Sequence, residues 1–100
     1  MKVIAHQPWQ WFLLKDNDSY IFDVNVDIRP ATFSVTFLLN EQEIEDYLKV
    51  GNEFLDNLAL LVHKSVVMQT SINFTNRFIN DKDLTNSITQ AVKEWQKQNS

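Results

Sequence analysis

The sequence contains no cysteine, one glycine and two prolines among its 100 residues. Without cysteine the chain has no disulfide, no thiolate metal site and no thiol nucleophile. Phosphate-binding loops need several glycines so that the backbone can approach the phosphate, and one glycine is too few. No serine is flanked by glycines as in the nucleophile elbow of a hydrolase. Several common catalytic sites are therefore excluded, and we expect a protein that is not an enzyme.

Long apolar runs are also missing. No stretch approaches the roughly 20 apolar residues of a membrane-spanning helix, and the first eight residues lack the apolar centre of a secretory signal. We therefore expect a cytoplasmic protein. The chain is nevertheless 44% hydrophobic and 12% aromatic, which is typical of a folded protein. Its length predicts a single globular domain over residues 1–100.

Acidic side chains are concentrated in one part of the chain. Residues 16–56 contain ten acidic and two basic side chains, a net charge of −8, whereas residues 1–15 and 57–100 each carry +2. Nucleic acids and anionic membranes require a positively charged surface, so we expect neither as a partner. A basic protein is the kind of partner that this charge favours.

One long amphipathic helix is predicted from Asn40 to Lys64. Asn40 is a good N-cap, and Glu43 is placed to complete a capping box with it. Spacings of three and four residues put six positions on one face, and three further apolar side chains widen that face. The six positions are Ile44, Leu48, Gly51, Leu55, Leu58 and Val62, and the three flanking residues are Tyr47, Phe54 and Leu61.

Gly51 is the unusual residue of this helix. A glycine in a helix interior costs roughly 1 kcal/mol relative to alanine. Our preferred explanation is the close approach of a neighbouring backbone or ring to Gly51. The alternative is a local break that divides the segment into two shorter helices.

Three strands are predicted before the helix, over residues 9–14, 20–28 and 32–39. The strand from Tyr20 to Ile28 has the clearest alternation of apolar and polar side chains. Polar residues 15–19 and the segment Arg29–Ala31 are expected to form the turns between strands. The natural assembly is an antiparallel meander with the helix packed across its apolar face.

The pattern is less clear after Lys64. Residues 65–80 are compatible with an extension of the helix or with a strand, and the alternation of Ile72, Phe74 and Phe78 suggests a fourth strand. A C-terminal helix is predicted from apolar residues at helical spacing: Leu84, Ile88, Val92 and Trp95. The predicted fold class is α+β, with a three- or four-stranded antiparallel sheet, one long central helix on one face and the C-terminal helix.

An apolar patch is expected on the outer face of the sheet, opposite the long helix. It comprises Phe12, Leu14, Ile21 and Leu38. Two explanations are open. Either the C-terminal helix covers the patch, or it forms the interface of a homodimer or of a complex with another protein.

No metal or cofactor site is predicted. Asp23, Asn25 and Asp27 have the spacing that opens an EF-hand loop, but Ile28 replaces the required glycine and Ser34 the bidentate glutamate. Alternation along a strand explains the spacing instead. His6 and His63 are the only histidines; together with a carboxylate they could in principle bind zinc, but no spacing in the sequence supports such a site.

The aromatic hairpin, the alternating strand and the entry Leu39-Asn40-Glu41-Gln42-Glu43 into a helix containing Tyr47 and Gly51 resemble a type of small bacterial protein. These proteins are mostly uncharacterised, and some are similar to immunity proteins that neutralise secreted toxins. The resemblance covers roughly residues 9–64 and carries no site residues, because such families share no fixed site. It implies a stoichiometric inhibitor that occludes a toxin, often a basic nuclease.

We therefore expect a protein-binding domain, most specifically an immunity-like inhibitor of a basic partner. The alternatives are a structural homodimer that uses the outer sheet face and a domain that binds a small molecule in a concave pocket. The residues predicted to bind the partner are Asp23, Asp27, Glu45, Asp46, Glu53 and Asp56.

Overall fold

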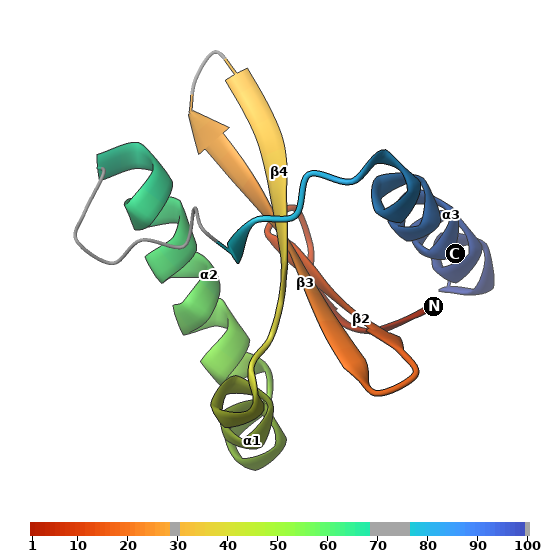
Figure 1. Ribbon diagram of the computed structural model, residues 1–100, viewed down its shortest axis with the longest axis horizontal. Helices are drawn as coiled ribbons and strands as arrows, with labels where there is room; N and C mark the ends of the chain where they lie inside the picture. The colour runs from red at the N-terminus through yellow and green to blue at the C-terminus, as the bar shows by residue number, and fades with distance from the viewer. Residues whose placement is uncertain (29–30, 69–76, 100) are drawn as a thin grey trace.

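The computed structural model describes residues 1–28, 31–68 and 77–99. In this part of the chain, four strands form one antiparallel sheet in sequence order, and three helices pack around it (Figure 1). The strands are β1 (Lys2–Gln7), β2 (Trp11–Asp16), β3 (Ser19–Ile28) and β4 (Ala31–Leu38). The helices are α1 (Glu41–Val50), α2 (Asn52–Met68) and α3 (Lys82–Asn99). The predicted α+β class is confirmed.

Strand β1 was not predicted, because its sequence lacks a regular alternation. It pairs antiparallel with β2, with Val3 opposite Leu14 and His6 opposite Phe12, and the register shifts between Val3 and Ala5. Such a shift is typical of a β-bulge, which interrupts the two-residue period that sequence analysis relies on. The fourth strand of the sheet is therefore the N-terminal segment.

The predicted alternation of β3 is confirmed. Phe22, Val24 and Val26 are buried on one face of the sheet, and Ile21 and Asp23 lie on the opposite face. Strand β4 follows the same rule, because its register pairs each apolar position with an apolar position of β3, such as Phe22 with Phe37. Pleating therefore gives the sheet two faces of different composition.

Helix α2 covers the first of these faces, which we call the α2 face. Its apolar cluster contains twelve buried residues: Trp11, Leu13, Phe22, Val24, Val26, Val35, Phe37, Leu39, Leu55, Leu58, Ala59 and Val62. The Trp11 side chain is fully buried, and its indole Nε1–H donates to Asp56 Oδ1 at 2.9 Å. The polar edge of this large ring is therefore satisfied within the core.

Helix α3 lies on the other face, which we call the α3 face, so that the sheet is sandwiched between helices (Figure 1). Its buried cluster is smaller, with five residues: Val3, Leu14, Ile21, Ile88 and Ala91. The predicted stripe of the C-terminal helix packs here, since Leu84, Val92 and Trp95 are partly buried against the cluster. Asp81 caps the helix by accepting from the backbone N–H of Asp83 at 2.9 Å.

The prediction of one continuous helix is wrong at Gly51. Gly51 has φ +88° and ψ −150°, and it separates α1 from α2. No atom lies within 4 Å of a Cβ built on this residue, so close approach of a neighbour does not explain the glycine. Its conformation does, because few residues other than glycine adopt it.

The break changes which apolar side chains are buried. Ile44 and Tyr47 of α1 pack against the α2-face cluster, but Leu48 is 67% exposed and Leu61 is 41% exposed. Both leucines were predicted to lie on the buried side of a straight helix. The predicted stripe is kept in α2, where Leu55, Leu58 and Val62 are buried, and the break at Gly51 leaves Leu48 of α1 outside it.

The segment after the undescribed residues 69–76 returns to the sheet and to α1. Arg77 forms a two-pronged ion pair with Glu43, at 3.0 and 2.6 Å, and its Nη2 also donates to the backbone O of Leu38 at 2.8 Å. This hydrogen bonding to Glu43 raises the pKa of Arg77 above its ordinary value. Glu43 also accepts from the backbone N–H of Asn40, which confirms the predicted capping box.

The predicted fourth strand over Ile72–Phe78 lies mostly outside the described residues. Phe78, at its end, lies in irregular backbone and packs against the α2-face cluster. No helix in the described ranges combines the length and apolarity needed to cross a membrane.

Candidate functional site

Asp23, the first of the predicted partner-binding residues, lies on the α3 face and is only partly exposed. Its Oδ1 accepts a hydrogen bond from Thr36 Oγ1 at 3.0 Å. Burial raises the pKa of the Asp23 carboxyl, and the hydrogen bond from Thr36 lowers it by a smaller amount. Asp23 therefore contributes negative charge beneath the surface of this face.

Asp27 and Asp56 meet at one cavity, although 29 positions separate them in sequence. The cavity has a volume of about 240 Å³ and is lined by Gln10, Val24, Asn25, Asp27, Asp56, Ala59, Leu60 and His63. Ala59 and Leu60 supply apolar surface beside the two carboxylates. We call it the acidic cavity, and its combination of apolar and acidic lining suits the stem and charged head of a lysine or arginine.

The open edge of β3 creates this cavity. Strand β2 begins at Trp11, opposite Val24, so β3 has no β2 partner beyond that point. The turn before β2 reaches it, where the backbone N–H of Asn25 donates to the carbonyl of Gln10 at 2.8 Å. The edge of β3 beyond Val24 is therefore open on its β2 side, and the exposed Asn25 and Asp27 lie along it, whereas Val26 remains fully buried.

Glu45, Asp46 and Glu53 lie within six positions of Gly51, on α1 and at the start of α2. Glu45 and Glu53 are exposed, and Asp46 accepts from Gln42 Nε2 at 3.1 Å. Residues 41–68 carry six acidic and two basic side chains, and the resulting net charge of −4 equals that of the whole chain. The remaining residues therefore balance to zero.

Exposed leucines accompany these carboxylates at helical spacing. In α1, Leu48 follows Glu45 by three positions, and in α2, Leu60 follows Asp56 by four, so each pair shares a helix face. Leu60 is 52% exposed. We call the exposed faces of α1 and α2, which carry Glu45, Leu48, Glu53, Asp56 and Leu60, the α1–α2 surface. Five of the six predicted residues thus occupy this surface and the adjoining acidic cavity, whereas Asp23 lies on the α3 face.

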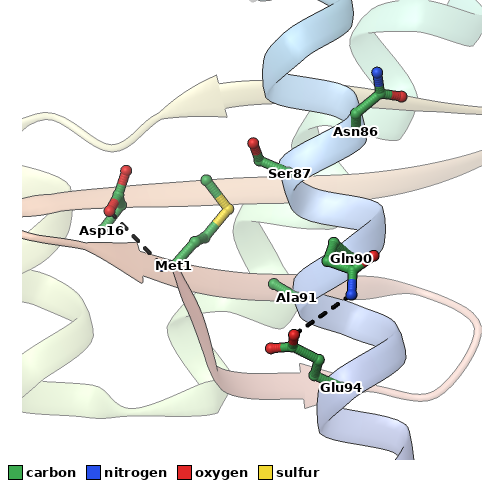
Figure 2. Close-up of a pocket in the computed structure, with 7 residues that line it drawn as sticks. All are labelled: Met1, Asp16, Asn86, Ser87, Gln90, Ala91 and Glu94. Carbon is green, nitrogen blue, oxygen red and sulfur yellow. Dashed lines mark hydrogen bonds and ion pairs between the residues drawn. The ribbon is translucent and has the colours of Figure 1, made fainter.

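A second cavity, of about 470 Å³, lies between the N-terminal corner of the sheet and α3 (Figure 2). It is lined by Met1, Asp16, Asn86, Ser87, Gln90, Ala91 and Glu94. The Met1 ammonium lies 3.8 Å from Asp16 Oδ1, and Glu94 accepts from Gln90 Nε2 at 3.4 Å. Asp16 and Glu94 are exposed and remain solvated, so this cavity does not favour acid–base chemistry, which requires a carboxyl group removed from water.

A third cavity, of about 340 Å³, lies on the α3 side of the same turn that borders the acidic cavity. Its lining is dominated by rings and amides: His6, Pro8, Trp9, Phe12, Asn25, Trp95 and Gln96. We call it the aromatic pocket. The Trp95 ring contacts the rings of His6 and Phe12 edge to face, with centroids 4.4 and 5.8 Å apart. Asn25 lines both this pocket and the acidic cavity.

Trp9 is the residue of this region that sequence analysis missed, since it was assigned to a strand. The backbone N–H of Gln10 donates to the carbonyl of Gln7 at 3.0 Å, which closes a turn with Pro8 and Trp9 at its centre. Trp9 has φ +66° and is 92% exposed. Proline followed by a residue with positive φ is the pattern of a type II turn, so Pro8 was a local signal for this turn.

The outer apolar patch is largely covered. Leu14 and Ile21 are buried in the α3-face cluster, and Phe12 packs against it, whereas Leu38 is 45% exposed. The first of the two explanations, coverage by the C-terminal helix, therefore accounts for three of the four residues. Among the described residues, no group of three or more histidines and carboxylates is arranged to hold a metal ion.

Comparison of the chain with protein-family models, with curated proteins and with solved structures finds no match. The functional argument therefore depends on the geometry of the acidic cavity, the α1–α2 surface and the aromatic pocket.

Proposed function

We propose that this chain is a non-enzymatic domain that binds a basic protein through the acidic cavity and the α1–α2 surface. The observation that carries the proposal is the convergence of Asp27 and Asp56 on one cavity beside Ala59 and Leu60. A lysine or arginine side chain of a partner would place its aliphatic stem on the apolar wall and its charge between the carboxylates.

The α1–α2 surface extends this contact. Its net charge of −4 accelerates the approach of a basic partner, and the exposed Leu48, Val50 and Leu60 provide apolar area among the carboxylates. Apolar contacts framed by polar groups are typical of protein interfaces. Glu45, Asp46 and Glu53 supply the charge of this frame, and Asp23 adds to the electric field from the opposite face of the sheet.

The narrower form of the proposal is an immunity-like inhibitor that sequesters a basic toxin. The acidic surplus and the resemblance of residues 9–64 to small immunity-like proteins support it. In that case the partner expressed alone should arrest cell growth, and co-expression with the chain should restore it. Normal growth with the partner alone would reject the inhibitor role but leave the binding role intact.

The test of binding uses two variants of equal charge. Asp27→Asn with Asp56→Asn removes both carboxylates of the acidic cavity, and the amide oxygen introduced at position 56 can still accept the hydrogen bond from the Trp11 indole. Asp18→Asn with Asp83→Asn changes the net charge by the same two units at exposed positions away from the cavity. Each immobilised variant is incubated with lysate of the native cell, and the retained proteins are identified by mass spectrometry.

We expect a basic protein to be retained by the wild type and by the Asp18/Asp83 control. The Asp27/Asp56 variant should bind that protein about tenfold more weakly or less, with a smaller dependence on salt concentration. Equal weakening by both variants would show that only total charge matters, and unchanged binding by both would reject the acidic cavity as the contact.

A structural homodimer is the competing function, and α3 leaves it little of the outer sheet face to use. Analytical ultracentrifugation at micromolar concentration separates the two proposals. We expect a monomer of about the 11.8 kDa chain mass. A stable dimer that Leu38→Asp dissociates would favour the homodimer instead.

A further inference from the structure

We propose that the aromatic pocket binds an organic cation, with the head group of an alkylated ammonium or a guanidinium. The site adjoins the acidic cavity at Asn25 but does not depend on the proposed protein partner. The inference combines the ring lining of the pocket with the exposure, backbone conformation and electrostatic surroundings of Trp9.

The rings come from two distant parts of the chain, residues 6–12 and α3, and meet at one cavity. His6 lies on β1, Trp9 in the β1–β2 turn, Phe12 on β2 and Trp95 on α3. The ring centroids of Trp95 and His6 are 4.4 Å apart, and those of His6 and Phe12 are 5.8 Å apart. The faces of such rings carry negative electrostatic potential, which attracts a cation within about 6 Å of the ring centroid.

Trp9 occupies a position that its chemistry does not favour. An indole ring that is 92% exposed gains little from burial in the folded chain, and a φ of +66° is a conformation that tryptophan rarely adopts. Glycine would satisfy the turn without strain. A strained, exposed tryptophan that lines a pocket is readily explained if a ligand covers the ring when it binds.

The charges near the pocket also favour a cation over an anion. Among the described residues, no lysine or arginine lines the pocket. Asp23 is the carboxylate on this face of β3 that lies closest in register to the pocket lining. It pairs with Phe12 across the strands and lies two positions from Asn25. The Asn25 side chain donates to the Trp9 carbonyl at 3.4 Å, an orientation that leaves its own carbonyl oxygen able to accept from a ligand N–H.

The volume of about 340 Å³ is at the lower end of the range for small-molecule sites. A compact head group such as trimethylammonium or guanidinium fits that size. The same head groups occur on free metabolites and on arginine or methylated lysine side chains, so the probes below include both sources.

The three tryptophans of the chain provide an internal control. In a proton–nitrogen NMR spectrum the indole N–H signals of Trp9 and Trp95 should shift when choline is added, whereas that of Trp11, buried and bonded to Asp56, should not. The matched ligand is 3,3-dimethylbutan-1-ol, which has the shape of choline without its charge. N-acetyl-arginine amide and an acetylated trimethyllysine amide are titrated in the same way.

We expect saturable shifts of Trp9 and Trp95 with at least one cation, and binding of the neutral isostere weaker by about tenfold. Preference for choline would identify a free metabolite, and preference for either amide would identify a protein side chain. Equal binding of choline and the neutral isostere would overturn the cation site, as would the absence of shifts with all three cations at tens of millimolar.

Variants at Trp9 complete the test. Trp9→Gly fits the turn and should leave the fold intact, as judged by an unchanged Trp11 indole signal, but it should weaken cation binding by about tenfold or more. Phe12→Leu keeps an apolar side chain and should also weaken binding, because it removes one ring. Retention of full affinity by both variants would reject the aromatic pocket as the site.

Discussion

The two faces of the sheet differ in how completely their helices cover them. On the α2 face, twelve buried residues include the rings of Trp11, Phe22 and Phe37, and the polar edge of Trp11 is satisfied by Asp56. On the α3 face, five residues are buried, and beside them lie a cavity lined by rings, the partly buried carboxyl of Asp23 and the exposed Leu38. The α2 face carries the larger core, bordered by the acidic cavity, and the α3 face carries a smaller core bordered by the aromatic pocket.

This difference indicates a division of roles. The α2 face buries more apolar side chains than the α3 face and therefore supplies the larger share of the hydrophobic stabilisation. The α3 face tolerates strained and partly desolvated groups because the other face stabilises the fold. Groups that reduce stability and persist in a folded chain are commonly found where ligands bind. The comparison makes predictions that differ between the two faces.

The largest expected difference is between two adjacent leucines of β2. Leu13 and Leu14 are both fully buried, and Leu13 points to the α2 face whereas Leu14 points to the α3 face. Substitution of a buried leucine by alanine costs about 2–5 kcal/mol, depending on how far the surroundings collapse into the space. We expect Leu13→Ala at the upper end, and Leu14→Ala at the lower end because α3 can move toward the sheet. Urea denaturation measures both, and equal losses would contradict the comparison.

The second prediction concerns Gly51, at the junction between α1 and α2. Gly51→Ala places a side chain at φ +88° and ψ −150°, which should cost about 1–3 kcal/mol although no atom would clash with the new Cβ. Val50→Ala, at an exposed neighbouring position, should change stability by less than about 0.5 kcal/mol. If Gly51→Ala is instead neutral or stabilising, the break is not required by the fold and α1 can continue directly into α2.

The features that sequence analysis predicted correctly are the local ones. The alternation of β3, the capping box of Asn40 with Glu43 and the apolar stripe of α3 each depend on residues within a few turns or a few positions of one another. The break at Gly51 was not chosen as the main explanation because the three-and-four spacing continues through it. A helical period cannot show whether glycine is helical or left-handed, since the surrounding packing decides that.

The candidate sites were harder to predict because their residues meet only in three dimensions. Asp27 and Asp56 were both named from their charge, but their shared cavity depends on where β2 begins relative to β3. The aromatic pocket joins His6 to Trp95, which are 89 positions apart. Only the turn at Pro8 and Trp9 had a local signal, and the aromatic content of the segment favoured a strand instead.

The third prediction is that removing one tryptophan stabilises the protein. Trp9→Gly should raise the free energy of unfolding by about 1 kcal/mol, because glycine adopts a φ of +66° without steric strain. Trp9→Ala removes the same indole ring but keeps a Cβ, so it should give no such gain. Thermal unfolding of the two variants measures the difference. Equal stability of the alanine and glycine variants would show that the backbone of Trp9 is not strained.

The smallest expected effect is the pH dependence that Asp23 gives to the α3 face. Burial raises the pKa of Asp23 in the folded state above its ordinary value of 3.8, so the folded state binds this proton more tightly than the unfolded state does. The contribution of Asp23 to stability is therefore fully present below pH 3.8 and is lost as the pH rises through the folded pKa. An asparagine side chain at this position would mimic the protonated carboxyl and still accept from Thr36.

Asp23→Asn should thus be more stable than the wild type at pH 7, and the difference should shrink toward zero as the pH falls below 4. Thr36→Val removes the hydrogen bond that lowers the pKa of Asp23, so its stability should decline more steeply with rising pH than that of the wild type. Urea midpoints between pH 3 and pH 7 measure both effects. A wild type that exceeds Asp23→Asn in stability at pH 7 would mean that the carboxylate is stabilised in place, and the α3 face would then lack the desolvated charge that distinguishes it from the α2 face.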